Sequence, residues 1–202
     1  MLIVRVFEHE VESVLRSGEG PVLERGAVCP GCQGKLSPWG SYRRYVRQEA
    51  ATQLRVRRAI CKSCGETHAL LPSFLFGRRI DLARAIFTAL VVATTGVGHR
   101  PLARSLGLPK TTVRSWLRCL RSRADPLRQG FALIAQRLAV QGPRPPPTAD
   151  ALALLLHGVE VAYQGAAQRF GLPAIGPVWA FTSMATGGWL MSNTDSPFPG
   201  RA

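Results

Sequence analysis

Two pairs of cysteines, each with two residues between them, place the strongest constraint on how this chain folds. Cys29 and Cys32 form the first pair, Cys61 and Cys64 form the second, and 28 residues separate the pairs. Each pair presents two thiolates from one tight turn, and two such turns complete the tetrahedral four-sulfur shell of a closed structural site. The spacing therefore predicts one structural Zn²⁺ ion held by these four cysteines.

A redox pair and a disulfide are the competing interpretations of the cysteines. A redox motif needs one reactive pair near a helix N-terminus, so the duplicated pair favours metal. His68 follows Cys64 by four residues and could replace one thiolate, although four cysteines already complete the shell. Cys119 lies beside an apolar helical stripe and is expected to be a small buried residue.

The residues between the cysteine pairs alternate in the way that strands do. We expect a strand over Gln53–Ile60 with one apolar face and one basic face. Its apolar face would hold Leu54, Val56 and Ile60, and its basic face Arg55 and Arg57. An opposing strand would pack Trp39, Tyr42, Tyr45 and Val46 and expose Arg43, Arg44 and Arg47. The interpretation is a zinc ribbon over residues 27–72, a hairpin clamped at its open end by metal.

Residues 99–121 read HRPLARSLGLPKTTVRSWLRCLR and predict two short helices joined at Gly107. The second helix has an apolar stripe at the i, i+3, i+4, i+7 spacing of a buried helical face: Val113, Trp116, Leu117 and Leu120. Its other face is basic and carries no acid. The pattern resembles a helix-turn-helix, in which the second helix recognises DNA. The alternative is a helical hairpin whose basic face is merely solvated.

The roles of the basic residues follow from their positions on the second helix. Recognition helices reach base edges near their N-terminal end, which predicts base contacts from Lys110, Thr111, Thr112, Arg114 and Ser115. Arg114 is the expected specificity residue, because a guanidinium can bind guanine O6 and N7 together. Further along the helix, Arg118 and Arg121 are expected to contact phosphates. On the ribbon, Arg55 and Arg57 are expected to hold the DNA backbone or a narrow groove.

The distribution of charge supports a nucleic-acid partner. The 202 residues carry a formal net charge of +14, and residues 29–128 hold 19 Lys and Arg against 4 Asp and Glu. A surface that neutralises phosphates leaves this footprint, and no basic amphipathic helix with aromatic anchors suggests a membrane partner. The apolar run Ala85–Gly98 is too short to cross a bilayer, and the N-terminal segment lacks an export cleavage site. We expect a cytoplasmic, nucleoid-associated protein.

The expected fold is mainly α-helical with a small β zinc ribbon, followed by a three-helix helix-turn-helix domain and C-terminal helices. In that scheme Asp81 caps a first helix from Leu82 to about Thr95, and Leu70–Arg79 is a connector. The expected segments are a leader (1–26), the zinc ribbon (27–72), the helix-turn-helix domain (80–123), a connecting helix (125–141), a Pro-rich linker (142–149), a C-terminal helix (150–171) and a tail (172–202) disordered from Ser192.

Four stretches together resemble the DNA-binding front end of bacterial insertion-sequence transposases, and also stand-alone bacterial proteins with the same order of zinc ribbon and helix-turn-helix. They are CPGC at 29–32, WGSYRR at 39–44, RAICKSCGETHALLP at 58–72 and GHRPLARSLGLPKTTVRSWLR at 98–118. Such transposases continue into a nuclease core with clustered carboxylates. This chain has five scattered acids after Glu66, whereas two-metal chemistry requires a cluster. The resemblance implies DNA binding without strand transfer.

The leading hypothesis is a non-catalytic, sequence-preferring protein that binds double-stranded DNA, either a regulator or a transposase-derived factor. One alternative is an accessory subunit of a transposase or recombinase whose catalytic core lies on another chain. Another is an adaptor whose zinc ribbon binds RNA or protein. The apolar stripe of the 150–171 helix either folds back on the core or forms a homodimer.

Overall fold

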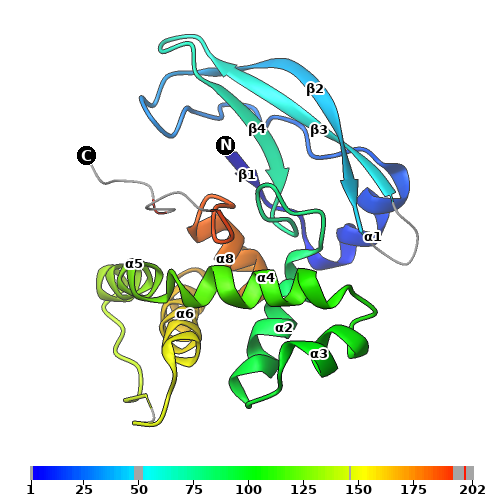
Figure 1. The fold of residues 1–202 in the computed structure, drawn as a ribbon. Coiled ribbons are helices and arrows are strands. Elements are labelled where there is room, and N and C mark those ends of the chain that lie inside the picture. Colours follow the sequence, from blue (N-terminus) through cyan, green and yellow to red (C-terminus); the bar gives the residue numbers. More distant parts are fainter. Residues whose placement is uncertain (1, 48–51, 146, 193–197, 199–202) are drawn as a thin grey trace.

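A computed structural model describes residues 2–47, 52–145, 147–192 and 198 of the chain. The described residues form a curved four-stranded sheet that lies over a layer of helices (Figure 1). Helix α8 (Val178–Ala185) lies between the two layers, next to the N-terminal strand. Every helix in the described ranges is too short or too polar to span a membrane.

The sheet has the strand order β1-β4-β3-β2. Its strands are β1 (Leu2–Val4), β2 (Leu36–Val46), β3 (Thr52–Cys61) and β4 (Thr67–Pro72). Strand β3 pairs antiparallel with both β2 and β4, while β1 pairs parallel with β4. The register between β2 and β3 shifts between Pro38 and Gly40, which leaves Trp39 as an extra residue in β2. The described part of the hairpin agrees with the expected strands.

Strands β1 and β4 extend the sheet beyond the two strands of the expected hairpin. Residues 67–72, half of them assigned to a connector, form β4, and the first residues of the leader join the same sheet through β1. Leu70 and Leu71 are both buried because the two faces of β4 pack against different apolar clusters. A strand buried on both faces shows no alternation of polar and apolar residues, so its sequence resembles an apolar linker.

The faces of β2 differ from the prediction. Trp39, Tyr42 and Tyr45 are exposed, with 57%, 41% and 60% of their surface accessible. Arg44, expected to be exposed, is half-buried, and its guanidinium donates to the carbonyl oxygens of Phe76 (2.7 Å) and Arg79. The loop after β4 covers this face of the sheet, so an arginine that satisfies buried carbonyls fits there better than a tyrosine ring.

In β3 the expected alternation is correct for Leu54 and Val56, which are buried, but not at Ile60. Ala59 and Cys61 are the buried residues at that end, and they belong to the second apolar cluster around Leu36 and Leu70. The strand therefore changes the face that it buries along its length. Residues Leu54 and Val56 face the helices, and Ala59 and Cys61 face the N-terminal segment.

Helices α2 (Ala83–Thr94), α3 (His99–Ser105) and α4 (Lys110–Arg121) form a three-helix unit below the sheet. The α4 stripe of Val113, Trp116, Leu117 and Leu120 is buried as expected. Gly107 has a φ of +62° in the α3–α4 turn, a left-handed conformation that glycine adopts at little cost. Asp81 does not cap α2: its carboxylate lies 3.3 Å from Arg47, and the N-cap position belongs to Leu82.

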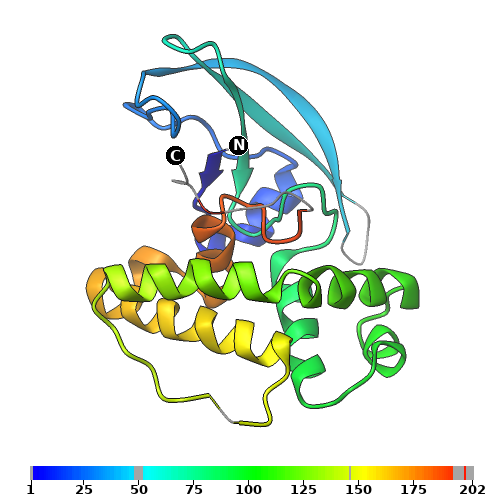
Figure 2. The ribbon, with the colours of Figure 1, turned by 60° about the vertical axis from the view of Figure 1, so that its left-hand side comes forward.

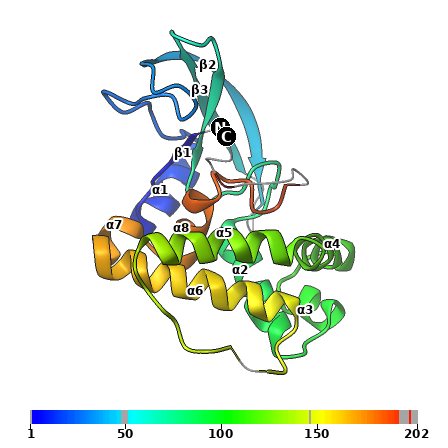
Figure 3. The same cartoon turned by 90° about the vertical axis from the view of Figure 1, so that its left-hand side faces the viewer.

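The C-terminal half folds back on this unit. Helices α5 (Ala124–Arg137) and α6 (Ala151–Phe170) run side by side, joined by the extended segment that passes below them (Figures 2 and 3). Asp150 caps α6 as expected, because its side chain accepts a hydrogen bond from the N–H of Ala153 (2.8 Å). The α6 stripe is buried within the chain, at Leu152, Leu155, Val159, Ala162 and Ala166. Of the two expected arrangements of this stripe, the structure has the one in which it folds back on the core. A homodimer through α6 stays an untested prediction.

The first part of the tail is helical and packs on the rest of the chain. Two further helices, α7 (Leu172–Ile175) and α8, follow α6, and α1 (Glu8–Ser17) covers one end of the sheet. Ser192 is buried, and Phe198 packs edge-on against Phe131 with 5.1 Å between ring centroids. Residues 193–197 and 199–202 lie outside the described residues, as does the disorder predicted for them.

Candidate functional site

The four predicted ligand cysteines meet at one end of the sheet. The sulfur atoms of Cys29 and Cys64 lie 3.8 Å apart, those of Cys32 and Cys61 lie 3.4 Å apart, and all four lie within 4.8 Å of one another. A tetrahedral site with Zn–S bonds of about 2.3 Å has sulfur–sulfur edges of about 3.8 Å. A disulfide requires about 2.05 Å, and all four cysteines are free thiols. The sulfur positions therefore fit a single metal ion.

The two cysteine turns have the same backbone hydrogen bonds. In the first turn the N–H of Gln33 donates to the carbonyl of Cys29, and the N–H of Cys29 donates to Gly34, each over 2.8 Å. In the second turn Gly65 donates to Cys61 (3.0 Å), and Cys61 donates to Glu66 (2.8 Å). The same pattern thus recurs at each pair, and each turn presents its two sulfurs to the same point.

Backbone geometry explains the residues next to the cysteines. Gln33 and Gly65 occupy equivalent positions in the two turns and both have left-handed backbones, with φ of +60° and +74°. A side chain at Gly34 would place its Cβ 2.3 Å from Oγ of Ser63 and 3.0 Å from Sγ of Cys61. Glycine is therefore required at residue 34, because the two turns approach each other there.

The thiols have unequal proton affinities. Hydrogen bonds from the backbone N–H groups of Cys64 and Ser63 lower the pKa of Cys61 to about 6. Although the N–H of Gly34 lowers it, the pKa of Cys32 is raised to about 12 by its contacts with the thiols of Cys61 and Cys64. Cys61 is thus the first of the two to ionise at neutral pH, and a thiolate is the form that binds metal.

His68 lies against this cluster from β4. Its side chain is 1% exposed, and Nε2 lies 3.4 Å from Sγ of Cys29 and 4.0 Å from the carboxylate of Glu66. Burial lowers the pKa of His68, so the ring is neutral at pH 7 and can donate an N–H to the Cys29 sulfur. Cys29, Glu66 and His68 form a second group of donor atoms close enough to share a metal ion.

Most of the predicted DNA-binding residues on α4 lie on its exposed surface. Lys110, Thr111, Arg114, Arg118 and Arg121 are exposed, whereas Thr112 and Ser115 are half-buried. Arg121 has a partner, since Nη2 lies 3.7 Å from the carboxylate of Asp150. A cavity of about 980 Å³ separates the Arg114, Arg118 and Arg121 side of α4 from the α2–α3 turn and the start of α6.

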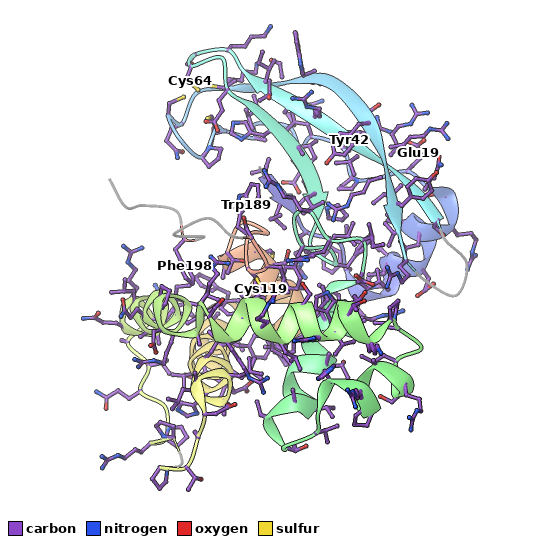
Figure 4. All side chains as sticks on the ribbon, viewed as in Figure 1. Glu19, Tyr42, Cys64, Cys119, Trp189 and Phe198 are labelled. Atoms are coloured by element: carbon purple, nitrogen blue, oxygen red, sulfur yellow. The ribbon has the colours of Figure 1, made fainter. Side chains whose placement is uncertain are left out.

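Arg55 and Arg57 have a partner that the sequence analysis missed. Glu19 lies beside β3, with one carboxylate oxygen 3.3 Å from Nε of Arg55 and the other 3.1 Å from Nη2 of Arg57. Figure 4 shows Glu19 and Cys64 at opposite ends of the sheet, with Cys119 on α4 distant from both. The structure thus keeps the cysteine cluster, the ribbon arginines and the α4 surface in three separate places.

Comparison with known families gives one match. Residues 29–101 match a family model described as a domain of unknown function (DUF6431). The matched segment contains both cysteine pairs, β2 to β4 and α2, and it ends before α4. No curated protein and no solved structure matches the chain.

The cluster geometry predicts one tightly bound metal ion per chain. Cys61→Ser should lose that ion and unfold at a lower temperature, because metal binding by small modules contributes roughly 10–16 kcal/mol at neutral pH. Cys119→Ser is the matched control, since Cys119 lies outside the cluster and should keep its ion. The measurements are elemental analysis and thermal unfolding. A metal-free wild-type protein would contradict this assignment.

Proposed function

We propose that this chain is a non-catalytic protein that binds double-stranded DNA through α3 and α4 and is stabilised by one structural zinc. The exposed face of α4 carries the proposal. It holds four basic side chains and no acid over three turns, on a helix whose opposite face is fully buried. A surface of this kind attracts phosphates and presents long side chains to base edges.

The packing of α3 and α4 supports a helix-turn-helix. Ala103 is 3% exposed where the two helices cross, and the N–H of Leu108 donates to its carbonyl oxygen over 2.9 Å. Leu102 and Val113 are buried in the same cluster as α2. These contacts fix the angle of α4 while its outer face stays exposed, which recognition in the major groove requires.

Zinc is the proposed metal because four thiolates in a tetrahedron suit Zn²⁺ and give it a closed site with no position for substrate. An iron site with the same ligands would be coloured and redox-active, so absorbance of the purified protein distinguishes the two. The proposed role of the ion is structural. It ties the segment before β2 to the turn after β3.

A second candidate function is an adaptor whose sheet binds single-stranded RNA. It is favoured by Tyr45, which is exposed on the same face of β2 as the exposed Arg43, and by Trp39, which is exposed at the bulge of that strand, whereas Tyr42 lies on the opposite face. Aromatic rings next to arginines form stacking surfaces for unpaired bases. Under the leading proposal these residues contact the DNA backbone. In an accessory subunit of a recombinase they would contact the DNA or the catalytic chain.

Binding to duplex DNA should depend steeply on salt. If about 6–10 phosphates are neutralised, the affinity should fall about 10³–10⁵-fold between 50 and 200 mM salt. Fluorescence anisotropy with a labelled duplex measures this, with Mg²⁺ present to show that the DNA is not cut. Stronger competition by single-stranded RNA than by duplex, at equal nucleotide concentration, would favour the adaptor instead.

Arg114 should determine sequence preference. Arg114→Ala should cost roughly 1–3 kcal/mol at the preferred site and relax the preference for one base, because a bidentate contact to guanine is lost. Arg137→Ala is the control, since Arg137 is exposed at the end of α5 and lies outside the proposed surface. Selection from a randomised DNA pool reports both variants. An unchanged consensus for Arg114→Ala would show that another residue reads the site.

Glu19 should weaken the DNA contacts of Arg55 and Arg57. Glu19→Gln frees both guanidinium groups, so affinity for all duplexes should rise and the log–log salt slope should steepen by about 1. Glu24→Gln removes the same charge from a nearby exposed position and serves as the control. Equal gains from the two variants would indicate an effect of net charge, with no role for the ribbon arginines.

A further inference from the structure

A second cavity, of about 340 Å³, borders the start of α4 on the side away from Arg114 and Arg118. It lies between α4, the end of β2 and the loop after β4. Its lining is rich in arginines and hydroxyl groups: Arg47, Arg78, Arg79, Ile80, Asp81, Thr111, Thr112, Ser115 and Trp116. None of the three arginines was assigned a role from the sequence, although the consecutive pair Arg78–Arg79 is visible there.

Two guanidinium nitrogens at this cavity are buried without a hydrogen-bond partner among the described residues. They are Nη1 of Arg47 and Nε of Arg79. Nη1 of Arg47 lies 3.3 Å from Asp81 without forming a hydrogen bond, and Arg79 uses Nη2 to donate to the carbonyl of Met191 (2.9 Å). Arg47 is therefore held by its ion pair, and Nε of Arg79 is the one of these two nitrogens with neither a hydrogen bond nor an ion pair among the described residues.

Arg78 has an unusual backbone conformation at the rim of the cavity. Its φ is +59°, in the left-handed region that favours glycine, and its side chain is exposed. The guanidinium carbon lies 5.7 Å from the ring centroid of Trp189. A residue with a side chain in this conformation carries strain, and such strain is commonly found at ligand-binding sites.

The charge at the cavity is positive. Asp81 is the only acid in the lining, its side chain is 6% exposed, and Arg47 lies against it. Asp81 interacts electrostatically with Arg79 as well as with Arg47, so three arginines face one carboxylate in the lining, and Arg78 adds to the positive charge at the rim. The hydroxyl groups of Thr111, Thr112 and Ser115 come from the first two turns of α4, where no acidic residue lies in the first turn. Donors of these types bind the oxygens of a phosphate group.

We propose that Arg47, Arg78 and Arg79, with the hydroxyls of α4, form a binding site for a phosphate group. Resting on the proposed function, the ligand is a backbone phosphate of the DNA that α4 contacts; free phosphate has the same chemistry. The 340 Å³ and 980 Å³ cavities border different sides of α4, one at Thr112 and Ser115 and the other at Arg114 and Arg118. A helix in the major groove has a phosphate backbone on each side, and these two cavities match that arrangement.

Arg78→Gly tests the site without endangering the fold, because glycine adopts a φ of +59° freely. The variant should melt at the same or a higher temperature than wild type. Its affinity for all duplexes should nevertheless fall about tenfold, and its log–log salt slope should decrease by about 1, since one charged contact to phosphate is lost. Arg137→Ala, an exposed arginine far along α5, should change neither quantity.

Inorganic phosphate provides a second measurement on the same full-length proteins. Phosphate should raise the melting temperature of wild type and of Arg137→Ala above that in chloride at equal ionic strength and pH, and should raise that of Arg78→Gly less. If phosphate stabilises Arg78→Gly less than wild type while the two proteins bind DNA equally well, the ligand of the site is free phosphate and not the DNA backbone. If wild type binds no DNA, the proposed function fails while the phosphate measurement still decides the site. If Arg78→Gly matches wild type in both measurements, the site is refuted.

Discussion

The fold depends on satisfying the backbone of one buried loop. Residues 73–77, between β4 and α2, are buried although they form no regular element. A buried loop carries polar groups that secondary structure cannot satisfy, so other parts of the chain must supply partners. Strand β1 supplies the carbonyl of Val4, which accepts a hydrogen bond from the N–H of Ser73. The guanidinium of Arg44 in β2 donates to the carbonyl of Phe76. The hydroxyl of Ser183 in α8 donates to the carbonyl of Leu75 over 2.9 Å.

This loop joins the sheet to the helices. Phe74, Leu75 and Phe76 are each at most 2% exposed and belong to the cluster that contains the α2 and α4 stripes. The loop continues into Arg78 and Arg79, which line the same cavity as the start of α4. The end of the sheet that carries the cysteine cluster lies far from this junction (Figure 4). The cysteine cluster can therefore stabilise the sheet without contacting the surface proposed to bind DNA.

The sequence predicted those features that depend on local spacing. The meeting of the four cysteines and the buried stripe of α4 follow from residue intervals alone, and so does the Asp150 cap. Features set by distant neighbours were missed. Glu19 pairs with Arg55 because residues 18–20 lie beside β3, and Arg44 is half-buried because a loop more than thirty residues later covers it. β4 was missed because burial on both faces removes the alternation that identifies a strand. No spacing rule connects such positions.

The parallel pairing of β1 with β4 has a consequence for how this architecture can be divided. β1 comes from the first residues of the chain and α8 from its last fifth, yet both complete the surroundings of the same central loop. The segment 29–101 that matches a family model contains that loop but neither β1 nor α8. The ends of this segment therefore do not coincide with the limits of a compact structural unit. Relatives that share only this segment must cover the loop with other residues, and a fusion or excision at those boundaries would cut through the hydrophobic core.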